Sequence, residues 1–371
     1  MAVDARQSMR SVVIAGGGTG GHVFPGLALA QELLRRQPRR EVQWIGACGG
    51  LEERLVPRER IPLLTLRMAG AARLGLLVKV RAVALAGWAT LRLFARFLAR
   101  RPALLIGVGG FASGPAVLAA LLLGVPTMLL EQNAVPGATN RLLSRFVRVT
   151  AASFDASKKQ LRGKVEVTGN PVRSEISAIP PFDSKSVRRV LGFGGSRGAR
   201  SINRAWVEGV AHLTDLPVEF FLQTGSADKQ VVEDAVIASG LKATVVEFID
   251  DLPREMARAD LLVCRAGATT VAEITAAGRA AVLIPYPFAT HDHQRANARS
   301  LAERDAAVII DPDDLNGKVL ADTLRELVGD PERVGRLAAN ARSLGRADAT
   351  ERVADVAESL ISGSRLEVSA A

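Results

Sequence analysis

A strand, a glycine-rich turn and a helix follow one another at two places in this sequence, once near the start and once near the middle. Residues 11–15 are apolar and precede the glycine run 16–21, after which a helical pattern starts near Pro25. Residues 189–193 are also apolar and precede the turn 194–198 and a second helical pattern. This order of elements opens nucleotide-binding α/β domains. The repetition therefore predicts two such domains in one chain.

The apolar runs that follow each turn are continuous and do not alternate with polar residues. Such runs are typical of parallel strands covered on both faces. The segment 169–181 is rich in turn-forming residues and is the natural linker between the halves. We therefore expect an α/β protein with two Rossmann-like domains that face each other across a cleft. The expected strands are 42–45, 104–108 and 127–130 in the first half, and 219–223, 243–248, 261–264 and 281–284 in the second.

Length, cysteine content and charge narrow the class of protein. A chain of 371 residues suits two domains. Its two cysteines, Cys48 and Cys264, lie far apart and match no metal-ligand spacing, which favours a reducing cytosol over a disulfide scaffold or a zinc site. The net charge of +10 indicates attraction to nucleic acid, anionic lipid or phosphorylated substrates, without choosing among them. Residues 1–10 are polar and lack the apolar core of a signal peptide.

Two segments raise the question of membrane contact. Residues 103–130 carry no charge and are long enough to cross a bilayer, but glycines and prolines divide them, which favours a buried strand–loop–helix–strand unit. Residues 62–101 mix apolar side chains with cations, and Arg92, Arg96 and Arg100 recur on one helix face. A basic amphipathic helix suits an anionic membrane surface. An ordinary surface helix packed on its own domain is the alternative interpretation.

The two glycine turns differ in what they can bind. Gly16, Gly18 and Gly21 match the dinucleotide fingerprint, which also requires an acid about 20 positions on to hold a ribose. The nearest acids, Glu52 and Glu53, come too late, which counts against an NAD-dependent oxidoreductase. The turn 194–198 suits a diphosphate, because glycine N–H groups and a helix N-terminus attract anions and the Ser196 hydroxyl adds a donor. A plain tight turn is the alternative interpretation.

Polar residues near the ends of the later strands are candidates for binding a sugar nucleotide. The stretch 264–273 runs from a strand end through small residues into a helix, where Glu273 could accept hydrogen bonds from a ribose or merely favour the helix N-terminus. Gln294 and Asn297, one turn apart, suit sugar hydroxyls. A metal site at His291 and His293 is weakly indicated, since no cysteine accompanies them. For the Asp-Pro-Asp sequence at 311–313, a solvated turn is the favoured interpretation over a metal motif.

Two residues are candidates for a general base. His22 ends the first glycine loop, and an imidazole titrates near neutral pH. Glu131 follows an apolar strand and should emerge at the carboxyl edge of the sheet.

At this point the sequence resembles the MurG family of bacterial peptidoglycan glycosyltransferases. The resemblance rests first on residues 16–25, which read Gly-Gly-Gly-Thr-Gly-Gly-His-Val-Phe-Pro. It continues in order through residues 107–115, 131–133, 169–173, 194–196, 248–251 and 268–273. It implies a GT-B fold. Residues 9–172, joined by a returning C-terminal helix at about 347–363, would form an acceptor- and membrane-associated domain, and residues 173–346 would bind the UDP-sugar.

The resemblance also implies an activity. The enzyme would transfer N-acetylglucosamine from UDP-N-acetylglucosamine to the C4 hydroxyl of undecaprenyl-pyrophosphoryl-N-acetylmuramoyl-pentapeptide (lipid I), with inversion at the anomeric carbon. His22 would be the first choice of base and Glu131 the second, with no metal ion or cofactor. The donor-binding positions carried over are Thr19, Gly20, Gly21, Asn133, Arg173, Ser196, Ile249, Ala268, Thr269, Thr270, Val271, Ala272, Glu273 and Gln294.

The same resemblance implies a location and partners. The protein would be peripheral on the cytoplasmic face of the bacterial inner membrane, with Leu76, Leu77 and Trp88 as members of the membrane-contacting patch. Cell-division and cell-wall synthesis proteins would be further partners, and nucleic acid would not. A GT-B transferase with another lipid or small-molecule acceptor is the nearest alternative, and a nucleotide-sugar-binding module or an NAD enzyme is a more distant one.

Overall fold

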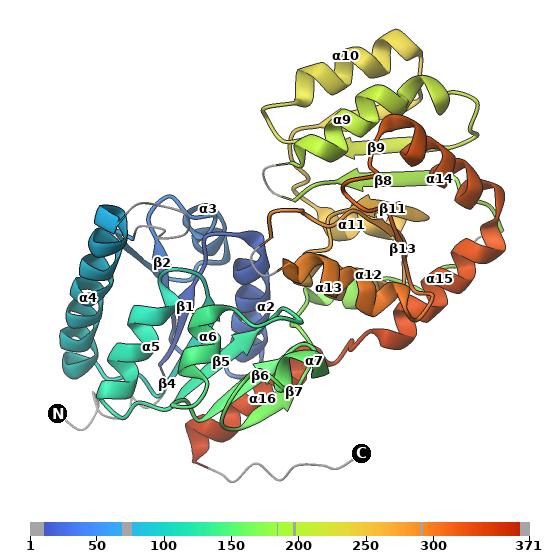
Figure 1. Ribbon diagram of the computed structural model, residues 1–371. Helices are drawn as coiled ribbons and strands as arrows, with labels where there is room; N and C mark the ends of the chain where they lie inside the picture. Colours follow the sequence, from blue (N-terminus) through green and yellow to red (C-terminus); the bar gives the residue numbers. More distant parts are fainter. Residues whose placement is uncertain (1–10, 69–75, 184, 196–197, 290–291, 364–371) are drawn as a thin grey trace. The chain divides into compact units, whose positions relative to one another are not determined.

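A computed structural model describes residues 11–68, 76–183, 185–195, 198–289 and 292–363, with side chains in the fourth helix described from Val80 on. The chain divides into two compact units (Figure 1). The first contains the described residues up to Val172 and those from Asp348 on, and the second contains Arg173–Ala347. Each unit is a parallel β-sheet with helices packed against it. The two Rossmann-like parallel sheets predicted from the duplicated pattern are confirmed.

The first unit holds a seven-stranded sheet in which all neighbouring strands are parallel, in the order β3-β2-β1-β4-β5-β6-β7. The strand order reverses between β1 and β4, and the crevice at such a switch point, at the carboxyl ends of the strands, is where α/β sheets bind ligands. The strands are β1 (Val12–Gly16), β2 (Val42–Ala47), β3 (Leu63–Leu66), β4 (Leu104–Gly109), β5 (Thr127–Glu131), β6 (Val149–Ala152) and β7 (Val165–Val167).

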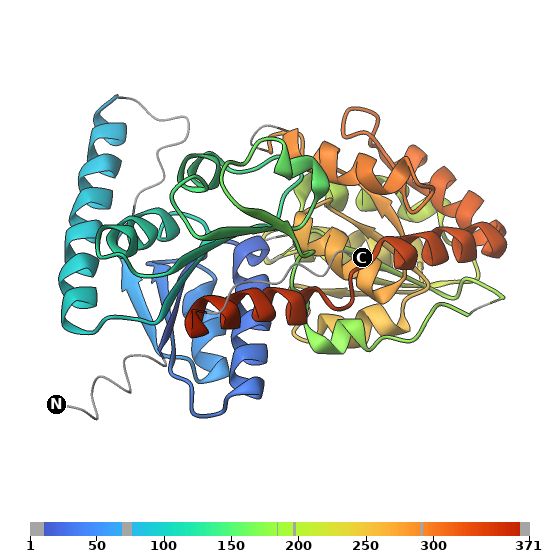
Figure 2. The ribbon, with the colours of Figure 1, turned by 90° about the horizontal axis from the view of Figure 1, so that it is seen from below.

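Helices cover both faces of this sheet, as the continuous apolar strands require. Successive residues of β1 point to opposite faces: Val12 and Ile14 pack with α2 and α16, whereas Val13 and Ala15 pack with α4 and α5. Figure 2 shows α4 and α16 on opposite sides of this sheet. The helices are α2 (Gly20–Arg36), α3 (Glu52–Leu55), η1 (Val56–Glu59), α4 (Leu76–Ala99), α5 (Ser113–Leu122), α6 (Ala138–Leu143), α7 (Asp155–Lys158) and α16 (Ala349–Ser362).

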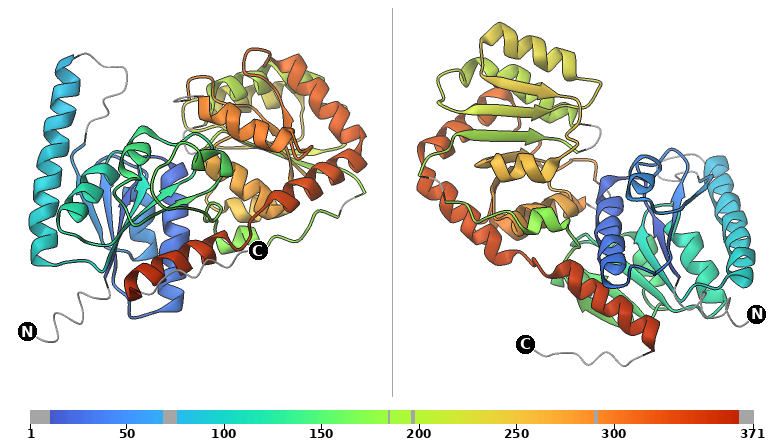
Figure 3. Two further views of the ribbon diagram at one scale, coloured as in Figure 1. Left: turned by 60° about the horizontal axis from the view of Figure 1, so that its bottom comes forward. Right: turned by 180° about the vertical axis from the view of Figure 1, so that it is seen from behind.

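The last helix that the structure describes, α16, belongs to the first unit, where it lies against α2 (Figure 3). Buried valines and alanines of α16 join the core on that face. Arg40 donates to both carboxylate oxygens of Glu358, and Arg36 pairs with Asp355 at 2.6 Å. Apolar packing and ion pairs thus hold α16 on the domain that opens the sequence.

The second unit holds a six-stranded parallel sheet in the order β10-β9-β8-β11-β12-β13, so its switch point lies between β8 and β11. Its strands are β8 (Arg189–Phe193), β9 (Glu219–Gln223), β10 (Ala243–Val246), β11 (Leu261–Cys264), β12 (Ala280–Leu283) and β13 (Val308–Ile309). Its helices are α8 (Ser174–Ser177), α9 (Arg200–Gly209), η2 (Val210–His212), α10 (Lys229–Ser239), α11 (Leu252–Arg258), α12 (Ala268–Ala277), α13 (His293–Ala302), α14 (Gly317–Gly329) and α15 (Pro331–Leu344).

Every strand predicted from an apolar run is present to within two residues at each end, and residues 103–130 form the predicted strand–loop–helix–strand unit. Strands β3, β6, β7 and β13 were not predicted; they have only two to four residues each, and β3, β7 and β13 lie at the edges of their sheets. The first helix begins at Gly20 rather than near Pro25. The difference arises because the Thr19 carbonyl already accepts hydrogen bonds from the N–H groups of His22 and Val23, both at 3.1 Å.

Candidate functional site

The loop after β1 is shaped by glycines that no other residue could replace without strain. Gly16, Gly17 and Gly18 have φ values of 142°, 144° and 89°, which side chains disfavour. A Cβ at Gly16 would overlap the Gly109 carbonyl, and a Cβ at Gly110 would overlap that of Gly17. The loops after β1 and β4 therefore pack backbone against backbone at the switch point.

His22 lies where these two loops meet. Helix α2 begins at Gly20, so Gly20, Gly21 and His22 form its first turn, with Thr19 as N-cap. The half-buried imidazole lies against Gly109, where a Cβ would come within 2.6 Å of its Cδ2 atom. Its Nδ1 is 3.3 Å from the Thr19 hydroxyl, and the tautomer decides which of the two donates. The glycine at 109 thus makes room for the ring.

Glu131 ends β5, and its side chain is only 2% exposed. Its carboxylate accepts four hydrogen bonds: from the backbone N–H and the amide of Asn133 at 3.0 and 3.3 Å, from the Gly137 N–H at 3.1 Å and from the Asn140 amide at 2.9 Å. Burial raises the pKa of Glu131, and these donors offset part of that effect. The carboxylate therefore organises the loop that carries Asn133.

In the second unit, the turn after β8 again requires glycine. Gly198 has a φ of 76°, and a Cβ there would overlap the Thr224 carbonyl. The Gly194 N–H donates to the side-chain oxygen of Gln223 at 3.2 Å, which joins the turn to the end of β9. Ser196, the predicted diphosphate donor, lies outside the described residues. The turn leads directly into α9, so a helix N-terminus follows it as predicted.

Helix α12 begins at Ala268, directly after the loop that follows β11. Glu273 lies in its second turn and is 4% exposed. Its Oε1 accepts a hydrogen bond from Arg173 at 2.7 Å, so two predicted donor-binding residues form an ion pair. The remaining predicted positions in this helix are Ala268, Thr269, Thr270, Val271 and Ala272; Ala268, Thr269 and Val271 are buried, and the other two are half-buried.

Other predicted polar ligands hold backbone segments. The Gln294 side-chain oxygen accepts the Tyr286 N–H at 2.9 Å. Asn297 was expected to bind sugar hydroxyls, but it is fully buried and donates to the Ala266 carbonyl at 3.1 Å. It therefore braces the loop before α12 instead, because α13 packs against α12. Ile249 is half-buried in the loop between β10 and α11.

The carboxylates of Asp311 and Asp313, which resemble a metal-binding motif in the sequence, contact an arginine. Arg295 pairs with Asp311 and lies 3.5 Å from Asp313, which accords with the preferred interpretation of that segment as a turn. His293 begins α13, and His291 lies outside the described residues. Within the described part of the chain, no group of three or more His, Cys, Asp and Glu side chains is placed to hold a metal ion.

Arg265, which directly follows β11, was not among the predicted site residues. Its guanidinium donates to the carbonyls of Ile284 at 3.1 Å and Pro285 at 2.9 Å, and to the Ser201 hydroxyl at 2.7 Å. It also lies 5.4 Å from the centre of the Tyr286 ring. Burial lowers the pKa of Arg265 to about 10. This cation links the start of α9 to the loop after β12; a cation directly after an apolar strand was the available signal.

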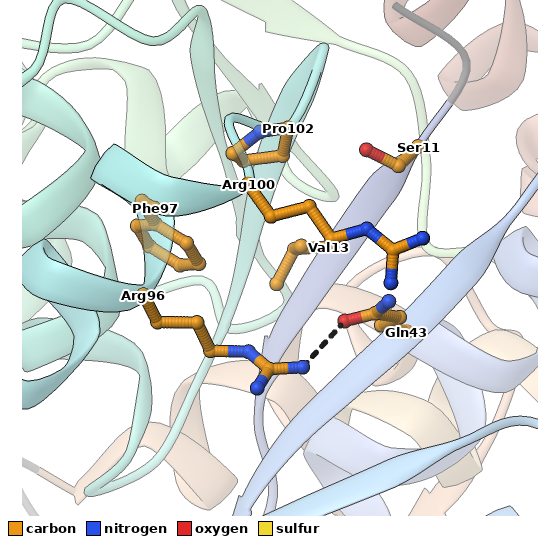
Figure 4. Close-up of a pocket in the computed structure, with 7 residues that line it drawn as sticks. All are labelled: Ser11, Val13, Gln43, Arg96, Phe97, Arg100 and Pro102. Carbon is orange, nitrogen blue, oxygen red and sulfur yellow. Dashed lines mark hydrogen bonds between the residues drawn. The ribbon is translucent and has the colours of Figure 1, made fainter. Parts of the chain in front are cut away.

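A small pocket lies at the opposite edge of the first sheet (Figure 4). Ser11 and Gln43, at the amino ends of β1 and β2, line it together with Arg96 and Arg100. Its volume of about 10 Å³ would hold about one water molecule. Arg96 donates to the Gln43 side-chain oxygen at 3.3 Å, and Arg100 lies 3.9 Å from Glu41. The pocket is therefore too small, and on the wrong sheet edge, to belong to the candidate site.

Comparison with known proteins agrees with two Rossmann-like domains, each with a loop at its switch point. Residues 12–152 match the glycosyltransferase family 28 N-terminal domain, and residues 189–360 match the glycosyltransferase family 28 C-terminal domain. The chain is 44% identical to a UDP-N-acetylglucosamine–N-acetylmuramyl-(pentapeptide) pyrophosphoryl-undecaprenol N-acetylglucosamine transferase from Myxococcus xanthus, over 95% of this chain and 94% of that protein.

Solved structures extend the comparison. The crystal structure of Acinetobacter baumannii MurG is 31% identical, with a TM-score of 0.74, over 94% of this chain and 99% of that one. A UDP-GlcNAc 2-epimerase from Neisseria meningitidis has a TM-score of 0.66 over 94% of this chain and 99% of that one, but at 14% identity it shares the fold alone. The GT-B fold expected from the resemblance is thus confirmed. The chain is a transferase of glycosyltransferase family 28 and belongs, within it, to the MurG family.

Proposed function

We propose that this protein transfers N-acetylglucosamine from UDP-N-acetylglucosamine to the C4 hydroxyl of undecaprenyl-pyrophosphoryl-N-acetylmuramoyl-pentapeptide. The observation that carries the proposal is the 44% identity, over nearly the full length of both chains, to a relative named for that reaction. The conserved fold alone would not choose an acceptor, because epimerases share it. Further support for this acceptor comes from the segments that resemble the MurG family at the switch point of each unit, such as 16–25 and 268–273.

The proposed chemistry is a single in-line displacement at the anomeric carbon. An α-linked donor that gives a β-linked product requires inversion, so the acceptor hydroxyl must lose its proton as the diphosphate leaves. The glycine turn after β8 and the helix that follows it can stabilise the leaving diphosphate through backbone N–H groups. We assign Ser196 and the first turn of α12 to the same task.

His22 is the proposed base that accepts the proton of the hydroxyl. If Nδ1 donates its hydrogen to Thr19, the lone pair of the neutral ring is on Nε2, as a base requires. Glu131 is the second candidate. Burial raises the pKa of Glu131, which makes its carboxylate a stronger base, but this carboxylate already accepts four hydrogen bonds from its own loop. The geometry therefore favours His22.

Donor recognition is assigned mainly to the second unit. Glu273 would accept the ribose hydroxyls while its Oε1 remains paired with Arg173, which keeps the carboxylate oriented before the donor arrives. Ile249 would offer its backbone to the uracil, and Gln294 would bind the sugar. In the first unit, Asn133 and residues 19–21 would contact the transferred sugar.

We further propose that the first unit binds the cytoplasmic face of an anionic membrane, where the lipid acceptor resides. The segment Val80–Ala99 of α4 is long and apolar enough to cross a bilayer, but it buries one side against the sheet through Leu93 and Phe97. Large apolar side chains remain exposed on three helices that neighbour one another in turn, α4, α5 and α6, and just beyond α6. They are Val80, Val83, Trp88, Leu91, Leu98, Leu118, Leu122, Leu142 and Phe146.

Arginines accompany this apolar surface, which we call the α4–α6 surface. Arg92 lies 5.4 Å from the Trp88 ring and Arg145 lies 4.5 Å from the Phe146 ring. Aromatic and basic side chains together suit the headgroup region of an anionic bilayer. The α4–α6 surface therefore supports peripheral binding. Leu76 and Leu77, which the resemblance adds to it, have side chains outside the described residues.

Transfer of radiolabelled N-acetylglucosamine tests the proposed activity. Purified protein would be given UDP-N-acetylglucosamine together with lipid I, with a diacylglycerol acceptor or with no acceptor. We expect label in a lipid product only with lipid I. Transfer to the diacylglycerol alone would assign another acceptor, and no transfer to any lipid would refute the proposal. Cell-division and cell-wall synthesis proteins remain proposed partners, to be tested by co-purification from membranes.

A further inference from the structure

Glu52 occupies a buried position beneath the first glycine loop. It begins α3, shortly after the end of β2, and its side chain is fully buried. Its Oε2 accepts the N–H of Gly18 at 2.7 Å, and its Oε1 accepts the N–H of Ala47 at 2.8 Å. One carboxylate thus joins the loop after β1 to the end of the neighbouring strand.

Three glycines make the space that this carboxylate fills. A methyl group at Gly17, Gly46 or Gly50 would overlap the side chain of Glu52. These glycines come from two separate loops and from β2, so the compartment exists only in the folded domain. Aspartate is one carbon shorter and could not reach Gly18 and Ala47 together. The fit therefore favours glutamate among the acidic residues.

The hydrogen bond to Gly18 changes what the loop can do. In dinucleotide-binding sheets, the second glycine of the motif lets the backbone approach a pyrophosphate. Here the N–H of Gly18 is already donated to Glu52, so the loop is held in place by the protein before any ligand arrives. Thr19 and His22 follow directly on this loop, and their positions depend on its shape.

We infer that Glu52 is a positioning residue for the transfer reaction. It fixes the backbone at Gly18, and through it the Thr19–His22 pair, in the arrangement that the reaction uses. Holding a reacting group in place before the reaction lowers the barrier, and a displacement of about 1 Å can cost roughly 100-fold in rate. The inference rests on the proposed role of His22 and goes beyond it by naming what holds that residue.

Glu52→Gln tests the inference with little change in volume. The amide keeps one acceptor oxygen, but its NH2 group faces an N–H donor, so one of the two hydrogen bonds is lost. We expect kcat to fall roughly 10- to 100-fold, while the KM for UDP-N-acetylglucosamine changes less than about twofold. The matched control is Glu53→Gln, because exposed Glu53 accepts only a peripheral bond from the Gly49 N–H and should leave kcat unchanged.

Hydrogen exchange of residues 16–22 provides a second measurement that does not depend on the chemistry of His22. Exchange should accelerate in Glu52→Gln and not in Glu53→Gln. Unchanged exchange would overturn the inference whatever the activity shows. Faster exchange with wild-type kcat would also overturn it, because the loop would then be held for stability alone.

Gly50→Ala tests the compartment from the other side, without removing the carboxylate. Gly50 has no positive φ, so alanine can adopt its backbone conformation, and the added methyl would overlap Glu52. We expect kcat to fall in Gly50→Ala, and the same change to have little further effect in a Glu52→Ala background, where the space is empty. Additive losses in the two backgrounds would contradict the inference.

His22→Ala, assayed in parallel, separates this inference from the proposed mechanism. If His22→Ala keeps wild-type turnover, the assignment of the base fails, whereas the exchange result still decides whether Glu52 holds the loop. If His22→Ala is inactive and Glu52→Gln is fully active, the base assignment stands and the positioning role is refuted.

Discussion

Arg173 and Glu273 form an ion pair of 2.7 Å between the first residue of the second unit and the second turn of α12. The side chain of Glu273 is 5% exposed and that of Arg173 is 18% exposed, so the pair is largely removed from water. A charge left alone in such a place is costly, and the cost exceeds what the pair itself contributes. The pair therefore links the stability of this domain to the residues proposed to bind the donor.

Removal of both partners of this pair should cost less than the two single removals added together. We expect Arg173→Ala and Glu273→Ala each to destabilise the protein, and the double variant to lose less than the sum, with a coupling of about 0.5–3 kcal/mol. Urea unfolding of the four proteins measures this coupling. The exposed pair Lys318–Asp322 is the control, where a much smaller coupling is expected because water screens an exposed ion pair. Equal couplings at the two sites would refute this account of burial.

Replacement of His22 should affect turnover more than donor binding. We expect His22→Ala to lower kcat by roughly 100-fold or more, because a positioned general base contributes about 10²- to 10⁴-fold. The KM for UDP-N-acetylglucosamine should change less than about twofold. Steady-state kinetics with lipid I measures both constants, and the exposed His212→Ala is the control. Wild-type kcat in His22→Ala would exclude this residue as the base.

Glu131 should lower the free energy of unfolding as the pH rises. Burial raises the pKa of Glu131 above its ordinary 4.5, so the folded state binds this proton more tightly than the unfolded state does. The stability that this group contributes is therefore fully present below an ordinary carboxyl pKa of about 4.5 and is lost as pH rises through the raised pKa.

Glu131→Gln removes that titration. We therefore expect the difference in unfolding free energy to shift in favour of the variant from about pH 5 to about pH 8. Urea unfolding of wild type and variant at both pH values measures the shift. A shift in the opposite direction would mean that the hydrogen-bond donors of Glu131 outweigh its burial.

The α4–α6 surface should determine binding to lipid vesicles. Leu91 is 70% exposed on α4, and Leu91→Glu places a charge where the membrane would lie. We expect about tenfold weaker cosedimentation with phosphatidylglycerol vesicles, since a buried aliphatic side chain is worth about 1.5–3 kcal/mol. Ile237→Glu, at a 73% exposed position on α10 of the other unit, is the control. Equal losses in the two variants would argue against this surface.

Much of the fold could be predicted from local pattern. Parallel strands buried on both faces must be continuously apolar, and runs such as 104–108 and 261–264 show it directly. Residues 16–18 are glycines and adopt a backbone conformation that side chains disfavour, so the loop could be predicted from the sequence. Short strands such as β7 carry too few residues to show a pattern.

The candidate site was harder to predict from the sequence, because its residues form hydrogen bonds and ion pairs with residues that are distant in the sequence. Asn297 carries an amide of the kind that binds sugar hydroxyls, but the packing of α13 buries it. Arg265 showed only as a cation after a strand, and its three acceptors come from two other segments. Polarity indicates that a residue needs partners and does not say whether the partner is a ligand or the protein itself.

By itself, the sequence determined two parallel α/β domains, each of which begins with a strand and a glycine turn. Buried strands require continuous apolar runs and positive φ values favour glycine, and both patterns involve residues that are adjacent in the sequence. Only the tertiary structure decided which polar groups meet. Glu52 and Gly18 are 34 residues apart, and Arg173 and Glu273 are 100 apart. Strand order brings the first of these pairs together, because β1 pairs with β2 in the first sheet. Glu52 is too far along the sequence for the ribose position of the dinucleotide fingerprint, but in the folded domain it lies directly beneath the glycine loop.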